Sequence, residues 1–258
     1  MKKRLSSIRQ LAILPIILCI TLGAGISTPF TPNTGPSILI LGDSITWGTE
    51  YFAKSLELII ADTQWTNTVI DGQHSRRVAF PTPNASTKYS GVKTFKKLND
   101  NGLKVDAVIV ALGSNDVALE TKESVYELII RDLLTTIGDV PTIWLTVNRR
   151  DTPAIAKRSV LFNQVLKRLV TEFPNLMIED WYSSIAKHPR WMAWDKIHLT
   201  PLGYRARAKL HRRLAADLFA QHVLANTTTT TMPLETTTTS TIAPTPTTTP
   251  TTNTSIAP

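Results

Sequence analysis

The stretch SILILGDS, residues 37–44, is a short apolar run that ends in a glycine, an acid and a serine. A run this short and this apolar is typical of a strand that is buried on both faces of a parallel sheet. Comparable runs recur at 68–70, 105–112, 142–147 and 176–179. Five such strands with intervening helices predict a three-layer α/β domain, a parallel sheet with helices on both faces.

Segments with helical periodicity separate these runs, at 51–61, 92–99, 123–137 and 154–173. A last helix is predicted from Thr200-Pro201, which provides an N-cap and a first-turn proline. Apolar residues at i, i+4 spacing predict the buried stripe of that helix: Leu202, Ala206, Leu210, Leu214 and Leu218.

The ends of the chain differ from the middle. A basic segment precedes the apolar run 11–26, which predicts a secretory signal peptide over 1–27 and a short linker over 28–36. An uncleaved membrane anchor is the alternative, although the run falls short of the ~20 apolar residues that span a bilayer. We therefore expect a secreted protein, attached to a membrane or cell wall at most through its N-terminus.

The C-terminal segment 226–258 is rich in threonine, with proline, serine and almost no charge. Such a composition cannot bury a core, so we expect a disordered tail. It can serve as a glycosylated spacer or have no function. These boundaries leave 37–225 as the single folded domain, which we expect to be monomeric.

Composition excludes several classes of site. Cys19 is the only cysteine and lies in the apolar N-terminal run, so a disulfide scaffold and a cysteine nucleophile are excluded. The net charge is +8, but no basic helix is interleaved with aromatic residues, and no zinc-finger spacing occurs. Nucleic acid is therefore not an expected partner, and we expect no metal or other cofactor because no His/Asp/Glu cluster has ligand spacing.

Ligands of an open parallel sheet bind beyond the carboxyl ends of its strands. Ser44 follows the first strand there, where backbone N–H groups at a helix start can stabilise an oxyanion. Asn115 follows the third strand within Gly-Ser-Asn-Asp, residues 113–116, and its amide can donate to the same oxyanion. Each motif alone is also an ordinary turn or helix cap.

Asp195 and His198 precede the last helix. A separation of three places both side chains on one side of a helical turn, so the carboxylate can orient the imidazole toward a hydroxyl. His74, in the loop after the second strand, is the rival base. Ser44, His198 and Asp195 are therefore the candidate catalytic triad.

Together, Gly42-Asp43-Ser44, residues 113–116 and residues 195–198 resemble the first, third and fifth blocks of the SGNH/GDSL hydrolase family. The resemblance spans about 37–225 and implies a flavodoxin-like sheet of order 2-1-3-4-5. It also implies Ser44 as nucleophile, His198 as base and Asp195 as its orienting acid. The implied oxyanion hole combines the Ser44 N–H, an N–H from the second block and Asn115.

The second block departs from the family pattern, which has a glycine. In the match to Asp-x-x-x-Gly-Arg, Ser75 replaces that glycine and Arg76 matches the arginine, while Gly72 is the alternative donor. This block, and the Trp-x-x-Trp-Asp-x-x-His segment, are similar to the branch that includes peptidoglycan O-acetyltransferase domains. Arg76, Trp191 and Trp194 are accordingly candidate substrate-binding residues, although both indoles can instead pack the last helix.

We therefore expect a secreted serine esterase that cleaves O-acyl esters, above all O-acetyl, on extracellular or cell-wall carbohydrate. An O-acyltransferase using the same triad is one alternative, and a non-catalytic wall-binding module is the other. The sequence does not specify the acyl chain, the glycan or the acceptor.

Overall fold

A computed structural model describes residues 35–230 except residue 84. The expected signal peptide lies outside the described residues, as does most of the Thr-rich tail. Five parallel strands form one sheet of order β2-β1-β3-β4-β5, which confirms the predicted fold. The strands are β1 (Ser37–Gly42), β2 (Asn67–Gly72), β3 (Ala107–Ala111), β4 (Thr142–Leu145) and β5 (Leu176–Glu179).

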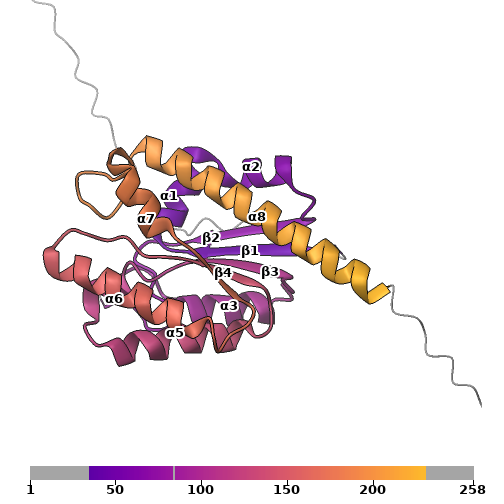
Figure 1. Ribbon diagram of the computed structural model, residues 1–258, viewed down its shortest axis with the longest axis horizontal. Coiled ribbons are helices and arrows are strands. Elements are labelled where there is room, and N and C mark those ends of the chain that lie inside the picture. Colours follow the sequence, from indigo (N-terminus) through magenta and orange to yellow (C-terminus); the bar gives the residue numbers. More distant parts are fainter. Residues whose placement is uncertain (1–34, 84, 231–258) are drawn as a thin grey trace, which may run out of the picture.

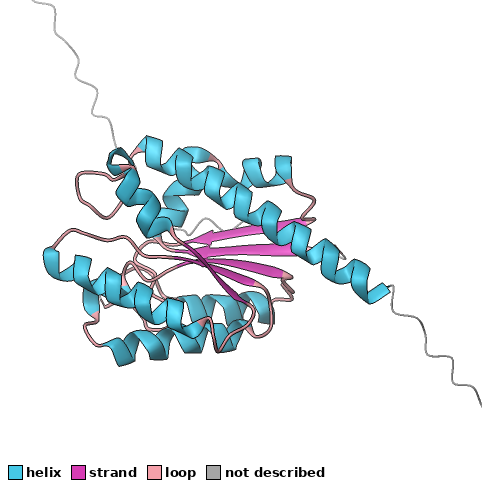
Figure 2. Cartoon of the chain, viewed as in Figure 1, coloured by secondary structure: helices cyan, strands magenta, loops and turns pink. Residues whose placement is uncertain are grey.

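Helices cover both faces of the sheet (Figures 1 and 2). One layer contains α1 (Ser44–Ala53), α2 (Ser55–Asp62), α7 (Trp181–Lys187) and α8 (Pro201–Thr230). The other contains α3 (Gly91–Asp100), α5 (Glu123–Ile137) and α6 (Pro153–Leu169). Two single turns, α4 (Asp116–Leu119) and η1 (Pro189–Trp191), lie in connecting loops.

The alternation of side chains along β1 divides the core in two. Ile38 and Ile40 pack under the α1/α2/α7/α8 layer, while Leu39 and Leu41 pack under the α3/α5/α6 layer. All four side chains are fully buried. Because both faces of the strand are covered, its sequence is continuously apolar rather than alternating.

The helix after β1 begins earlier than the periodicity predicted. It starts at Ser44 rather than at 51, because the side chain of Asp43 accepts a hydrogen bond from Ile45 N and caps the first turn. It also ends at Lys54, whose φ of 52° is left-handed and separates α1 from α2. Ser44 is therefore the first residue of a helix.

The predicted buried stripe of the last helix was wrong in its first half, where Leu202 is exposed. The buried side instead carries Tyr204, Arg207 and His211 before it reaches Leu214. The helix also continues to Thr230, beyond the predicted domain boundary after Ala225. Among the described helices, none combines the length and the apolar character needed to cross a membrane.

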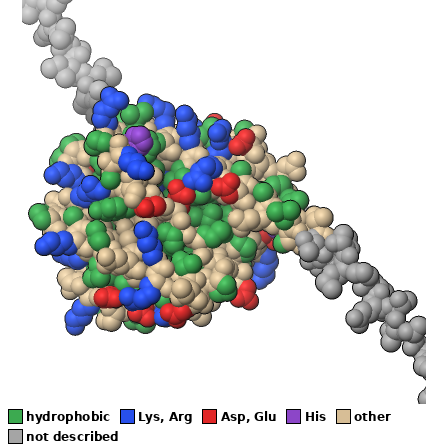
Figure 3. All heavy atoms as spheres, in the orientation of Figure 1, with side chains coloured by type: hydrophobic (Ala, Val, Ile, Leu, Met, Phe, Trp, Pro, Cys, Tyr) green, Lys and Arg blue, Asp and Glu red, His purple; other side chains and the backbone are tan. Residues whose placement is uncertain are grey.

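The register of the sheet places the functional loops side by side. Gly42 at the end of β1 pairs with Gly72 on one side and with Ala111 on the other. The loops that follow these three strands therefore leave the same edge of the sheet. On the face shown in Figure 3, basic, acidic and hydrophobic side chains are interspersed, without a field of one sign.

Candidate functional site

Ser44 lies at the N-terminal end of α1, next to the carboxyl edge of the sheet. Its Oγ is 3.0 Å from Nε2 of His198, although 154 positions separate the two residues in the sequence. On the other side of the ring, Nδ1 of His198 is 2.7 Å from Oδ2 of Asp195. The carboxylate fixes Nδ1 as the protonated nitrogen, so Nε2 is free to accept the hydrogen of Ser44 Oγ.

The carboxylate of Asp195 is held by its own loop. Its Oδ1 accepts hydrogen bonds of 3.0 Å from the backbone N–H groups of Ile197 and His198. Burial alone would raise the pKa of Asp195, but these two bonds and the imidazole together bring that pKa below its usual value. Asp195 is therefore ionised at neutral pH, as a residue that orients a histidine must be.

The loop of Asp195 and His198 is closed by backbone bonds at both ends. Ala193 N donates to His198 O at 2.9 Å, and Arg150 N, beyond β4, donates to Lys196 O at 3.0 Å. Lys196 has a φ of 56°, in the left-handed region that favours glycine. This tight turn brings the carboxylate back onto the imidazole ring.

His74 lies beside this pair but does not contact Ser44 among the described hydrogen bonds. Its ring packs against Trp47 with centroids 4.5 Å apart. Partial burial, and then the charge of His198, lower the pKa of His74. The geometry therefore favours His198 over His74 as the base.

The second-block loop has the backbone shape that a glycine would normally supply. Ser75 has a φ of 58°, so a serine occupies the left-handed position where the family pattern has glycine. Gly72 has a different reason to be glycine, because a Cβ there would overlap the backbone nitrogen of Trp47. This close approach of β2 to α1 makes Ser75 the better candidate for the second oxyanion N–H.

Asn115 connects the third loop to the second. Its Nδ2 donates a 3.0 Å hydrogen bond to Arg76 O, which fixes the amide plane and leaves its second N–H available. Asn115 therefore contacts the loop that contains Ser75, and both loops leave the same edge of the sheet as the N-terminus of α1.

The role of Asp116 was not identified from the sequence. Its buried carboxylate accepts hydrogen bonds from Val78 N and from Arg77 Nε at 3.2 Å. Burial raises its pKa to about 6, and the Arg77 guanidinium opposes that rise. Asp116 thereby joins the loop of Asn115 to the loop of Ser75. In the sequence, the position of Asp116 directly after Asn115 was the only signal of this role.

The three candidate substrate-binding residues lie in different environments. The guanidinium of Arg76 is turned inward: it is 2% exposed and bonds to Gly42 O at 3.0 Å and to Asp71 Oδ1 at 2.6 Å. Trp191 stacks on His188 and Trp181, which is the packing alternative. Trp194, in contrast, is 94% exposed beside Asp195. Of the three, Arg76 is buried, Trp191 is half-buried, and Trp194 is the most accessible to a substrate.

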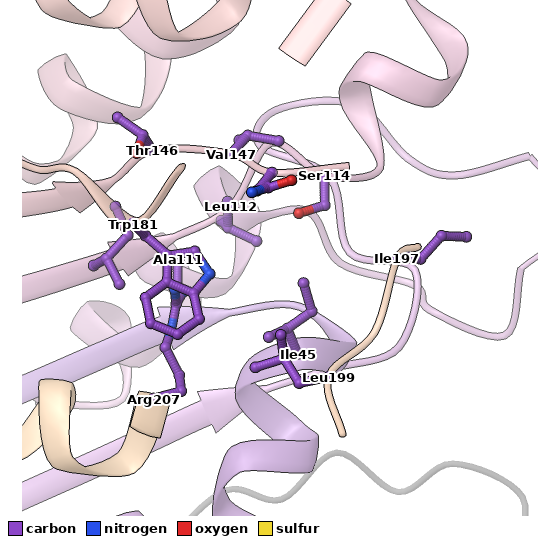
Figure 4. A pocket seen from close by; sticks show the side chains of 12 residues that line it. Ile45, Ala111, Leu112, Ser114, Thr146, Val147, Trp181, Ile197, Leu199 and Arg207 are labelled. Carbon is purple, nitrogen blue, oxygen red and sulfur yellow. The ribbon is translucent and has the colours of Figure 1, made fainter. Parts of the chain in front are cut away.

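A buried polar network around Arg207 borders Ile45 and Ser114, the sequence neighbours of Ser44 and Asn115. The guanidinium of Arg207 lies over the Trp181 ring and lines a small cavity together with Ser114 and Asn148 (Figure 4). Arg207 Nε donates to His211 Nε2 at 3.3 Å, and the other ring nitrogen is 3.0 Å from Ser55 Oγ. The cavity, of about 10 Å³, is too small for an acyl group. Arg207 therefore belongs to the support of the site, not to its substrate surface.

The described residues contain no group of three or more His, Cys, Asp or Glu arranged to hold a metal ion. The arrangement that they do contain is a hydroxyl, an imidazole and a carboxylate in hydrogen-bonded sequence, at the N-terminus of a helix. This arrangement can deprotonate the hydroxyl as it attacks a carbonyl.

Known structures with the same fold include several ester-cleaving enzymes. A carbohydrate acetylesterase from Sinorhizobium meliloti has a TM-score of 0.56 at 15% identity, covering 72% of this chain and 99% of that one. The C-terminal catalytic domain of Streptococcus pneumoniae peptidoglycan O-acetyltransferase A has a TM-score of 0.52 at 17% identity, covering 75% and 95%. An acetylxylan esterase from Geobacillus stearothermophilus has a TM-score of 0.50 at 20% identity, covering 69% and 94%.

No curated protein compared with the chain matches it. Residues 40–206 match the model of the GDSL-like Lipase/Acylhydrolase family, which covers all three motif blocks. This match confirms the resemblance drawn from those blocks and the prediction of an SGNH-type serine hydrolase. The chain belongs to the GDSL-like lipase/acylhydrolase family.

Proposed function

We propose that this protein is a secreted serine esterase that removes O-acyl groups, principally O-acetyl, from extracellular or cell-wall carbohydrate. The observation that carries the proposal is the hydrogen-bonded series from Ser44 Oγ through His198 to Asp195. The carbohydrate substrate is supported by the names of structural neighbours, and secretion by the basic and apolar N-terminal segment.

The reaction starts with attack of Ser44 Oγ on the ester carbonyl carbon while His198 Nε2 accepts the serine proton. The negative charge that forms on the carbonyl oxygen is stabilised by the N–H groups of Ser44 and Ser75 and by the Asn115 amide. One such donor contributes about 3–4 kcal/mol to the stability of the transition state. His198 then protonates the leaving alcohol, which leaves an acyl group on Ser44.

Water completes the cycle: His198 Nε2 removes a proton from a water molecule as its oxygen attacks the acyl carbonyl carbon. The bond from that carbon to Ser44 Oγ then breaks, His198 returns the proton to Ser44 Oγ, and the free acid is released. Throughout both halves, Asp195 keeps the imidazole in the tautomer that presents Nε2 to the serine. A sugar hydroxyl can take the place of water, which would make the protein an O-acyltransferase. The half-exposed side chain of His198 and the fold shared with an O-acetyltransferase domain favour this as the second candidate.

The direct test is hydrolysis of p-nitrophenyl acetate by the wild type and by Ser44→Ala. We expect the substitution to abolish turnover and to abolish labelling by a serine-directed fluorophosphonate. Turnover that persists in Ser44→Ala would contradict the assignment of the nucleophile. A wild type that neither turns over nor is labelled would instead indicate a non-catalytic wall-binding module.

Hydrolysis and transfer are separated by adding glycan acceptors to the same reaction. If acylated glycan forms in excess of free acid, the transferase is the correct assignment. If acetate is released in proportion to nitrophenol with every acceptor, the esterase is correct.

A further inference from the structure

A ridge of aromatic side chains runs along α1 from the catalytic serine. Its members are Trp47, Tyr51 and Phe52, together with His74 from the loop after β2; we call this set the α1 ridge. Trp47 stacks on Tyr51 with ring centroids 4.9 Å apart and an interplanar angle of 8°. His74 packs on Trp47 at 4.5 Å, and Phe52 meets the edge of Tyr51 at 4.9 Å.

The helix aligns this ridge with the nucleophile. Positions i, i+3 and i+7 share one face of a helix, so Ser44, Trp47 and Tyr51 project to the same side of α1. At 1.5 Å per residue, Tyr51 lies roughly 10 Å beyond Ser44 along the axis. That distance is longer than a single sugar ring, so only an extended substrate held at Ser44 reaches Tyr51.

The ridge is exposed and also held in place. Tyr51 and Phe52 are 56% and 57% exposed, which core packing does not explain. Phe52 rests on the buried ring of Tyr204 at 5.2 Å. Gly48 permits this contact, because a Cβ there would overlap the Tyr204 ring. An ordered aromatic surface loses little side-chain entropy when a ligand binds to it.

The chemistry of the ridge favours a sugar over an acyl chain. An acyl chain needs a concave pocket that encloses most of its surface, whereas these rings protrude into solvent. Flat aromatic faces pack on the C–H face of a sugar, while the Tyr51 hydroxyl and the His74 ring nitrogens can bond to its hydroxyl groups. Continuity with Ser44 places this surface on the path of the molecule that carries the ester.

We propose that the α1 ridge binds the carbohydrate chain of the substrate, beyond the sugar whose acyl group reacts at Ser44. This inference rests on the proposed function and makes the enzyme selective for oligomeric over monomeric esters. Trp194 stands beside Asp195 in a different loop, so its contribution to substrate binding is separable from that of the ridge.

The experiment compares the hydrolysis of the same ester, O-acetyl, on carbohydrates of different chain length. The probes are O-acetylated xylose and O-acetylated xylan oligomers, then O-acetylated peptidoglycan fragments as a second glycan, with p-nitrophenyl acetate as the small ester. The proteins are the wild type, Tyr51→Ala and Tyr51→Phe, with Tyr89→Ala as the control for losing an exposed aromatic ring elsewhere. Because Tyr51 is largely exposed, its variants are expected to fold, which circular dichroism checks.

We expect the wild type to prefer oligomers, and Tyr51→Ala to lose about tenfold in kcat/KM on an oligomer, mostly through KM. Its loss on the acetylated monomer should be several-fold smaller, Tyr51→Phe should recover most of the oligomer activity, and Tyr89→Ala should retain it. Equal losses on monomer and oligomer, or a wild type without preference for either oligomeric glycan, would overturn the proposal. If p-nitrophenyl acetate is cleaved but no glycan ester is, the ridge proposal fails while the esterase stands; if neither is cleaved, the proposed function itself fails.

Discussion

The buried, opposite charges of Asp43 and Arg207 offer a quantitative test of how the start of α1 is stabilised. Asp43 caps the helix that starts at Ser44 and is 1% exposed, while Arg207 on α8 is 4% exposed. Burial raises the pKa of Asp43, which the Arg207 charge opposes. Burial likewise lowers the pKa of Arg207 to about 10, which the Asp43 charge opposes. Each residue therefore stabilises the charged form of the other.

The size of this coupling follows from Coulomb's law. At an effective dielectric constant of about 20, two unit charges in contact attract by about 4 kcal/mol, and two charges twice as far apart by about 2 kcal/mol. The described residues show no ion pair between Asp43 and Arg207, so the smaller figure applies. The substitution Arg207→Met keeps the apolar stem and removes the charge. It also removes the cost of burying a guanidinium, so we expect a net loss of about 2 kcal/mol in the free energy of unfolding at pH 7. Because the variant raises the pKa of Asp43 further, this loss should shrink as the pH falls through that pKa.

The assay is a double-mutant cycle of Arg207→Met and Asp43→Asn, measured by urea unfolding. If the two charges stabilise each other, the double variant should be more stable than the sum of the single losses predicts, by about 2 kcal/mol. The value of kcat for p-nitrophenyl acetate should fall in Arg207→Met with little change in KM, since Arg207 does not face the substrate. Arg205→Met, at an exposed position on the same helix, is the matched control. Additivity within about 0.5 kcal/mol would refute the coupling.

Three further predictions test the loops of the site. Ser75→Gly removes a side chain from a left-handed position, so the free energy of unfolding should rise by about 0.5–1 kcal/mol with esterase activity retained; a fall in stability would contradict the strain argument. Gly72→Ala forces a Cβ against the backbone of α1 and should cost about 1–3 kcal/mol in urea unfolding and lower kcat; wild-type values would contradict the close approach. Because burial raises the pKa of Asp116 to about 6, the folded state takes up a proton between its unfolded value and 6, so this group lowers stability as the pH rises through that window. Asp116→Asn should flatten that part of the stability curve, and an unchanged slope would exclude Asp116 as its origin.

The sheet could be predicted from the sequence because strands covered on both faces have unbroken apolar sequences. That prediction also located the site. The carboxyl ends of parallel strands lie at one edge of the sheet, and ligands of open parallel sheets bind beyond that edge. The spacing of Asp195 and His198 then needed only a local turn, which is visible in sequence. The hydrogen-bonded contact of His198 with Ser44 did not follow from these two facts; it was expected from the resemblance to the SGNH/GDSL family.

The start of α1 and the buried side of α8 were not predictable in the same way. The periodicity predicted a helix only from 51, whereas α1 begins at Ser44 and its first turn is capped by the carboxylate of Asp43. On α8, the i, i+4 spacing of the leucines predicted one buried side, but the side that is buried includes Arg207 and His211. A charged residue looks exposed in sequence unless its surroundings are known, and here the guanidinium of Arg207 lies over the Trp181 ring and donates to His211.

Several arginines of this basic chain hold the loops of the site together. Arg76 holds β1 and β2 together at their carboxyl ends, Arg77 joins two loops through Asp116, and Arg149 donates to Ser114 O while it pairs with its own loop. Like Arg207, these residues place positive charge inside the protein, near the carboxyl ends of the strands. Their hydrogen bonds and ion pairs there join loops that follow different strands. The charge excess is therefore weak support for an anionic substrate. A lysine at these positions would keep the charge but lose the planar fork that bridges two acceptors, so Arg→Lys substitutions here should loosen the site rather than preserve it.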